Sequence, residues 1–208
     1  DTSKKYSWLK SPRYEGVPME VGPLSRMLVN YVRGHEQVQG LVNHVLKTLG
    51  VGPEALFSTL GRVAARGIET QLLVDKIGDW VDELADNMGK GELRIHDNSK
   101  WDPSSWPADS MGAGFHEAPR GSLGHWVHVK DAKIERYQCV VPSTWNAGPR
   151  DSGGIPGPYE AALVGTPVAD PEQPIEILRT VHSFDPCMAC GVHVVEPGGR
   201  EITRVKAR

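Results

Sequence analysis

Two cysteines close to the end of the sequence are spaced to bind a metal. Cys187 and Cys190 are separated by two residues, and His193 follows three residues later. A short Cys-x-x-Cys turn can direct both sulfurs to one side, where they can bind a soft metal ion, and the histidine can add a ligand. Pro186 restricts the backbone before the first thiol, and Gly191 leaves it adaptable after the second. These residue types indicate a metal site.

Taken alone, the spacing permits three interpretations: half of a zinc site, a redox-active pair, or two thiols that fill space. A structural zinc site usually has a second pair of ligands, and the only other cysteine is Cys139. A thioredoxin-like pair belongs near the start of a βαβ unit, and a reactive thiol needs positive surroundings, whereas this pair comes late and follows Asp185. A zinc-stabilised interaction module remains an alternative, which predicts one zinc and neither nickel nor iron in elemental analysis.

The composition excludes several classes of protein. With 39% hydrophobic and 24% charged residues, the 208-residue chain is typical of globular proteins. A net charge of -3 without a basic run disfavours nucleic-acid binding. No apolar segment approaches the roughly 20 residues that span a bilayer, so we expect membrane association only through a partner. The 3 cysteines are too few for a disulfide framework.

The first half of the chain is predicted to be helical. Apolar residues recur with the period of a helix between residues 38 and 49 and again between 73 and 88, within a helical region that we place at 20–90. Short turns between such helices favour antiparallel neighbours. Residues 91–115 lack this period and contain Trp101 and Trp106, so we predict a loop there that packs by its aromatic side chains.

Residues 116–193 are expected to carry the functional segments. Pro119 and Gly121 cannot lie inside a helix, so they predict a turn that directs Arg120. Residues 126–129 and 134–141 predict a β-hairpin, which Pro142 ends. We therefore predict an α+β fold, with long antiparallel helices, a β-hairpin and an irregular metal-binding C-terminal segment.

The metal stretch and its surroundings resemble a known family. The run Asp185-Pro186-Cys187-x-x-Cys190-x-x-His193 is similar to the C-terminal signature of the nickel-iron hydrogenase large subunit. Further blocks resemble the same family in the same order, at residues 6–12, 20–24, 116–121, 137–146 and 157–163. The resemblance covers essentially the whole chain, but the family's earlier Cys-x-x-Cys pair is missing. We therefore expect residues 1–208 to be the C-terminal part of one large-subunit domain.

The resemblance implies an oxidoreductase that reversibly oxidises H2 to protons and electrons at a nickel-iron centre. The electrons would pass to an iron–sulfur small subunit, because 3 cysteines cannot hold both an active site and a cluster relay. The chain by itself is expected to be inactive. A hydrogen-sensing regulatory relative is the alternative within the family. The implied location is periplasmic or membrane-associated through the small subunit, with the cytoplasm as the alternative.

The family match assigns roles at the metal. Cys187 corresponds to a terminal nickel ligand that can accept a proton when H2 is split, and Cys190 to a thiolate that bridges nickel and iron. Arg120 corresponds to an arginine above the open side of the metal pair, where a guanidinium suits a cyanide ligand. Asp185 corresponds to a nearby carboxylate that could pair with Arg120. Capping of a local turn is an equally good reading of Asp185.

Other residues match the pocket around the iron and a second metal site. The resemblance places CO and cyanide ligands of the iron against Arg120 and four further residues, Ala118, Pro119, Pro142 and Ser143. Without the family, turn chemistry at the end of a strand would be the better reading of Ser143. A magnesium or iron ion is implied at the backbone carbonyl of Cys139 and the ring of His193. We expect the Cys139 side chain itself to be a buried apolar group.

The tail after His193 resembles an extension that family members carry as precursors. A maturation endopeptidase would cut between His193 and Val194 once nickel-insertion proteins have loaded the metal, and would remove residues 194–208. An uncut tail could keep Cys187 and Cys190 away from the closed site until the metal arrives. An ordinary terminal strand, around residues 201–206, is the alternative.

Overall fold

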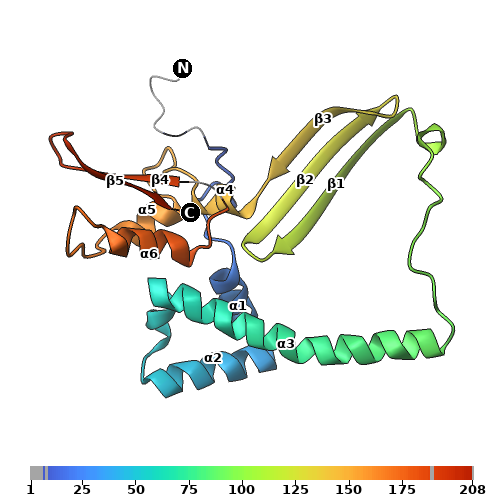
Figure 1. The fold of residues 1–208 in the computed structure, drawn as a ribbon, viewed down its shortest axis with the longest axis horizontal. Helices are drawn as coiled ribbons and strands as arrows, with labels where there is room; N and C mark the ends of the chain where they lie inside the picture. Colours follow the sequence, from blue (N-terminus) through green and yellow to red (C-terminus); the bar gives the residue numbers. More distant parts are fainter. Residues whose placement is uncertain (1–6, 8, 188–189, 208) are drawn as a thin grey trace.

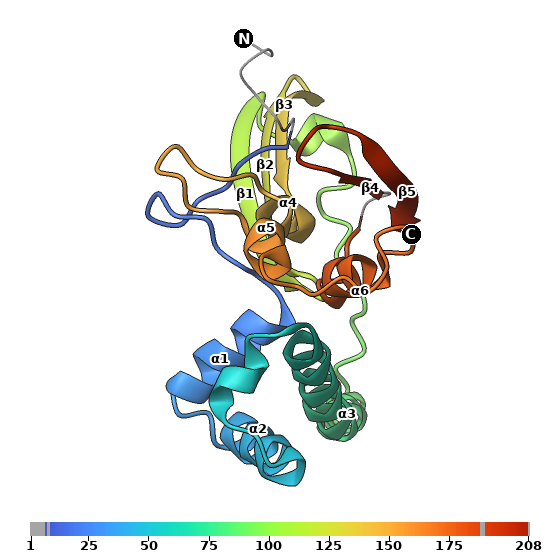
Figure 2. The same cartoon turned by 90° about the vertical axis from the view of Figure 1, so that its left-hand side faces the viewer.

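The computed structural model describes residues 7, 9–187 and 190–207 of the chain and has two parts. Three helices form one part: α1 (Pro23–Val32), α2 (Glu36–Leu49) and α3 (Thr59–Gly89). The other part contains two antiparallel sheets and three short helices. Figure 2 shows the helices below and the sheets above, with the chain crossing between them just before α1. The mixed α+β architecture that the sequence predicts is confirmed.

The helices begin and end where the sequence supplies caps. The side chain of His35 accepts a hydrogen bond from the backbone N–H of Val38 and so caps α2, which ends at Gly50 in the left-handed conformation (φ 64°). A 3-10 turn, η2 (Pro53–Leu56), leads to Ser58, whose side chain caps α3. The prediction of helices over 20–90 is confirmed, and α2 and α3 run antiparallel (Figure 1).

The apolar core lies between the three helices and stops partway along α3. Ala65 and Ile68 are the last apolar side chains of α3 that are fully buried, at 1% and 5% exposure. Beyond them α3 extends past α1 and α2 (Figure 1), and its apolar side chains are about half exposed. The exposed set comprises Leu73, Val74, Ile77, Trp80, Val81, Leu84 and Met88. The helix is therefore as predicted, but half of its apolar stripe is uncovered in this chain.

The first sheet has one strand more than the sequence predicted. Its strands are β1 (Asp109–Ala118), β2 (Gly121–Lys130) and β3 (Lys133–Val140), all antiparallel in the order β1-β2-β3. The hairpin prediction is confirmed by β2 and β3. The prediction of a loop over 91–115 is wrong beyond residue 108, because β1 pairs with β2 along its whole length. Gly112 and Gly114 lower the strand propensity of this segment, so the sequence did not predict the strand. Pairing with β2 stabilises it instead.

Two short turns connect the strands of this sheet, one at each end. Pro119 and Arg120 connect β1 to β2, and Gly121 adopts φ 130°, which other residues rarely adopt. Asp131 and Ala132 connect β2 to β3 with φ 49° and 58°, the left-handed pair that a two-residue hairpin turn requires. The sequence prediction of a turn that directs Arg120 is thus confirmed.

The last third of the chain holds the short helices and the second sheet. After α4 (Pro142–Asn146), α5 (Pro158–Leu163) and α6 (Ile175–Ser183), the strands β4 (Cys190–Val195) and β5 (Glu201–Ala207) form a hairpin. Pro142 ends β3 as predicted, but it also begins α4, where its missing N–H costs nothing. The prediction that the metal segment is irregular is wrong from residue 190 onward, because the backbone there pairs with β5. Within the described residues, no helix combines the length and the apolar character needed to cross a bilayer.

Candidate metal centre

Arg120 and Asp185 hold each other at the centre of the candidate site. The Nε of Arg120 donates to the backbone carbonyl of Asp185 at 2.7 Å, and its Nη2 donates to the Asp185 carboxylate at 3.2 Å. Both side chains are more than a third exposed, so the pair contributes at most about 1 kcal/mol to stability. Its effect is mainly geometric, because it fixes the chain two residues before Cys187.

The backbone at Asp185 adopts an uncommon conformation. Its φ of 54° lies in the left-handed region, which aspartate tolerates better than most residues. The residue follows the end of α6, and its N–H donates to the carbonyl of His182. The Asp185 carboxylate therefore pairs with Arg120, and the residue joins the local turn through its backbone N–H.

Ser143 anchors the other side of the same segment. Its hydroxyl accepts a hydrogen bond from the backbone N–H of Cys187 at 3.1 Å. Ser143 is buried in the first turn of α4, whereas the Cys187 thiol is free and exposed. The structure therefore brings Arg120, Ser143, Asp185 and Cys187 together, although they come from three separate segments of the sequence.

The remaining pocket residues lie beside this group. The carbonyl oxygens of Ala118 and Pro119, in the β1–β2 turn, accept hydrogen bonds at 2.8 and 2.9 Å from Arg26. Pro142 is buried next to Ser143. All the residues that the sequence assigned to the iron pocket therefore lie on the two segments that contact residues 185–187.

Cys190 and His193 lie in β4, where the backbone pairs with the tail. Cys190 is opposite Ala207, and His193 is opposite Arg204. The placement of their side chains lies outside the described part of the structure. Their assignment as ligands therefore stays a prediction.

Cys139 is only partly buried, so the prediction of a buried apolar side chain is wrong. It faces His125 on the neighbouring strand, with 3.9 Å between Sγ and Nε2. Its carbonyl oxygen accepts a hydrogen bond at 3.2 Å from the ammonium of Lys10, which also donates to Gln138. The carbonyl is thus turned toward a positive charge, which is compatible with a cation ligand. Among the side chains that the structure describes, which do not include those of Cys190 and His193, no group of three His, Cys, Asp or Glu residues could hold a metal ion.

The chemistry of the donors fits a soft metal that this chain would share with other ligands. The exposed Cys187 thiol is not in a disulfide and could bind a metal as a thiolate, with Cys190 three residues further on. Two sulfurs are too few for a closed tetrahedral site. The donor set therefore fits half of a thiolate-bound centre.

Arginines of α3 make three contacts that the sequence did not predict, and two of these reach the segment just before Cys187. Arg62 lies 4.0 Å above the ring of Phe184 and makes a paired salt bridge to Glu20 at 2.8 Å. Arg66 donates to the carbonyl of Ser183 at 3.0 Å. Their helical positions on α3 gave no signal, because their partners lie more than 40 residues away in the chain.

Solved structures of nickel-iron-selenium hydrogenases share this fold. The nickel-iron-selenium hydrogenase of D. vulgaris Hildenborough in its as-isolated oxidised state superposes with a TM-score of 0.69 and 40% identity, over 89% of this chain and 38% of that one. The reduced, active form of the enzyme from Desulfomicrobium baculatum gives 0.63 and 34%, over 88% and 36%.

Sequence comparison then gives the family. Residues 1–193 match the profile described as nickel-dependent hydrogenase, and the chain belongs to that family. It is 49% identical over all 208 residues to the uptake hydrogenase large subunit of Bradyrhizobium diazoefficiens. It is 48% identical over 205 residues to the hydrogenase-1 large chain of Escherichia coli K12. The chain spans 35% and 34% of these two relatives, respectively.

Proposed function

We propose that this chain is part of the catalytic subunit of a nickel-iron hydrogenase, which converts H2 reversibly into two protons and two electrons. The observation that carries the proposal is the Arg120–Asp185 pair, which fixes the segment leading to the exposed Cys187 thiol. A free thiol beside a guanidinium and a carboxylate is suited to moving protons. Membership of the nickel-dependent hydrogenase family supports the same reaction.

In this proposal Cys187 and Cys190 would hold nickel as thiolates, and Cys190 would also be a ligand of iron. A second pair of thiols, from a part of the subunit outside this chain, completes the site. The bound metal pair would supply the electrophile and the electron acceptor for the cleavage of H2. The Cys187 Sγ accepts one proton. Asp185 keeps the Arg120 guanidinium in place, so that its positive charge faces the pocket.

The pocket residues would surround the CO and cyanide ligands of the iron. Ala118 and Pro119 supply the wall beside Arg120, and Pro142 and Ser143 supply the opposite wall. A hydroxyl has one donor in addition to its lone pairs, so Ser143 can accept from the Cys187 backbone and still donate to a cyanide. At the second site, the carbonyl of Cys139 and the ring of His193 would bind magnesium or iron.

The tail fits a segment that is removed after metal loading. The family profile ends at residue 193, whereas the curated relatives align over the complete chain. In the β4–β5 hairpin, residues 190–193 pair with residues 204–207. A cut between His193 and Val194 would remove the whole of β5 and free Cys190 from its strand partner. This supports a maturation endopeptidase that acts after nickel insertion.

The partners follow from the electron balance. Each H2 releases two electrons, and an iron–sulfur small subunit is proposed to carry them away, since the 3 cysteines of this chain cannot hold a relay as well. A periplasmic or membrane-associated location through that subunit is the proposed one, in line with relatives named uptake hydrogenases.

The test uses the full-length subunit purified with its small subunit. We expect nickel and iron in the protein, infrared bands from metal-bound CO and cyanide, and H2-dependent reduction of a dye. Intact mass of the loaded subunit should show that residues 194–208 are absent. Zinc without nickel or iron would overturn the proposal. Active enzyme that retains the tail would overturn only the maturation step.

A further inference from the structure

The Arg26 side chain makes all its hydrogen bonds where the helices meet the β1–β2 turn. Arg26 lies on α1, and a guanidinium has five N–H donors in a rigid plane. Nε and one Nη2 hydrogen bond go to the carboxylate of Glu69 on α3, the latter at 2.7 Å. The other three go to the carboxylate of Glu117 at 3.0 Å and to the carbonyls of Ala118 and Pro119. All five donors are therefore used.

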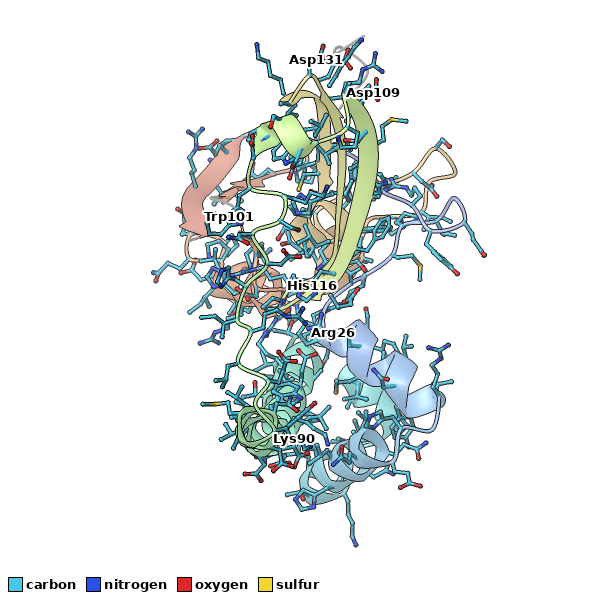
Figure 3. All side chains as sticks on the ribbon, turned by 90° about the vertical axis from the view of Figure 1, so that its right-hand side faces the viewer. Arg26, Lys90, Trp101, Asp109, His116 and Asp131 are labelled. Atoms are coloured by element: carbon cyan, nitrogen blue, oxygen red, sulfur yellow. The ribbon has the colours of Figure 1, made fainter. Side chains whose placement is uncertain are left out.

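The three acceptors on the sheet immediately precede Arg120. Glu117 and Ala118 end β1, and Pro119 begins the turn to β2. Figure 3 shows Arg26 at the junction between the helices and the end of β1 near His116. The planar fork of Arg26 thus fixes the backbone from which the Arg120 side chain departs toward Asp185.

Charge strengthens this clamp. The side chains of Arg26 and Glu69 are only 17% and 16% exposed, so their ion pair is better shielded from solvent than the Arg120–Asp185 pair. Burial lowers the pKa of Arg26, but hydrogen bonds and charge from Glu69 and Glu117 outweigh it, so the pKa stays above its ordinary value. Arg26 is therefore charged at neutral pH, and its contacts to the two carbonyls are charge-assisted.

The backbone at the start of α1 also contacts this turn. A Cβ on Gly22 would lie 2.8 Å from the carbonyl oxygen of Arg120, and a Cβ on Gly121 would lie 2.7 Å from the Gly22 nitrogen. The two glycine segments therefore touch directly. The turn is therefore held by Gly22 as well as by Arg26, and we expect a change in the clamp to alter the direction of the Arg120 side chain.

We propose that Arg26 is a positioning residue for Arg120: it sets where the Arg120 guanidinium lies relative to Asp185 and Cys187. This inference rests on the proposed hydrogenase function, because the readout is the electronic environment that Arg120 would create at the iron ligands. A purely structural role for Arg26 makes a different prediction. It would lower the unfolding temperature and the amount of metal bound without changing the site of molecules that are loaded.

The experiment compares R26K with R33K in the full-length subunit complexed with its small subunit. Lysine keeps the charge but cannot make five hydrogen bonds in a plane. Arg33, at the end of the same helix, is exposed and provides the matched control. Infrared bands of the cyanide ligands and kcat, each normalised to nickel content, are measured together with R120K as the reference for a displaced Arg120.

We expect the cyanide bands of R26K to shift in the same direction as those of R120K. Turnover per nickel should fall between roughly tenfold and a hundredfold, the loss that follows misplacement of a group by about 1 Å. R33K should leave both measurements at wild-type values. Cyanide bands of R26K that stay at wild-type positions, while those of R120K move, would overturn the inference.

A second variant protects the test against poor folding of R26K. E117Q removes one charged acceptor and leaves the Arg26–Glu69 pair intact, so we expect a smaller shift in the same direction. Unshifted bands in E117Q when R26K does not load metal would also overturn the inference. If the wild-type complex shows no cyanide bands at all, the proposed function fails instead, and the two failures are thereby distinguished.

Discussion

The two turns of the β1–β2–β3 sheet differ in what holds them. The turn at Pro119 and Arg120 is fixed by contacts from α1, from the segment before it and from residue 185. The turn at Asp131 and Ala132 is formed mainly by the strands that it joins, with one further backbone hydrogen bond from Asp131 to the carbonyl of Ala108. Arg120 therefore lies where several segments hold the chain, and we expect the far turn to tolerate substitution better.

The same contrast appears along α3. Its first half is buried against α1 and α2, and it carries the arginines that contact residues 183 and 184. Its second half has the same apolar period but is exposed in this chain. The buried half of α3 is therefore also the half that contacts the segment before Cys187.

The largest effect is expected from Gly121→Ala. The added methyl group would meet the Val21 side chain and the Gly22 backbone, at a φ of 130° that alanine avoids. We expect a loss of roughly 3 kcal/mol of stability, from overpacking and backbone strain together. The measurement is the apparent unfolding free energy of the full-length subunit. Gly40→Ala in α2 is the control, since nothing lies near its Cβ, and it should be stabilising.

A smaller effect is expected from Asp185→Ala. The carboxylate contact to Arg120 is lost, and the contact of Arg120 to the backbone carbonyl remains. We expect H2 oxidation to fall about tenfold, because Arg120 is less well placed. Stability should change by no more than about 1–2 kcal/mol, since the pair is exposed and alanine disfavours the left-handed conformation. Asp185→Asn keeps an acceptor and should lose less activity; equal losses in both variants would show that the charge alone matters.

At the far turn, Ala132→Gly should increase stability. Ala132 has φ 58°, which glycine adopts without steric cost. We expect a gain of about 0.5–1 kcal/mol in unfolding free energy and no change in activity. A loss of activity in this variant would mean that the two ends of the sheet are coupled and that the far turn is not independent of the turn at Arg120.

The smallest effect is expected from His128→Gln near the same end. The ring nitrogens of His128 lie 2.9 Å from the Asp109 carboxylate and 3.1 Å from that of Glu135, linking the three strands. Both carboxylates are exposed, at 60% and 42%, so we expect less than about 1 kcal/mol of destabilisation. Unfolding measured at low and high salt checks this, and a loss above 2 kcal/mol would contradict it.

Much of the helical part could be predicted from the sequence. A period of apolar residues and a nearby cap suffice for α2 and α3, because both signals act within a few turns of helix. Strand β1 could not be predicted, since its glycines weaken its own preference and its partner β2 provides the pairing. Strand β4 could not be predicted for a related reason, since its pairing depends on the tail.

The short-range features of the candidate site could be predicted from the sequence: the Cys187–Cys190 spacing, the turn at Pro119 and the end of β3 at Pro142. These depend on a few adjacent residues whose backbone preferences are intrinsic. The contacts of Arg26 with the carbonyls of residues 118 and 119, and of Ser143 with the nitrogen of Cys187, could not be predicted in this way. Those contacts join residues 44 to 93 positions apart, and such distances are bridged only when the helices and sheet have packed.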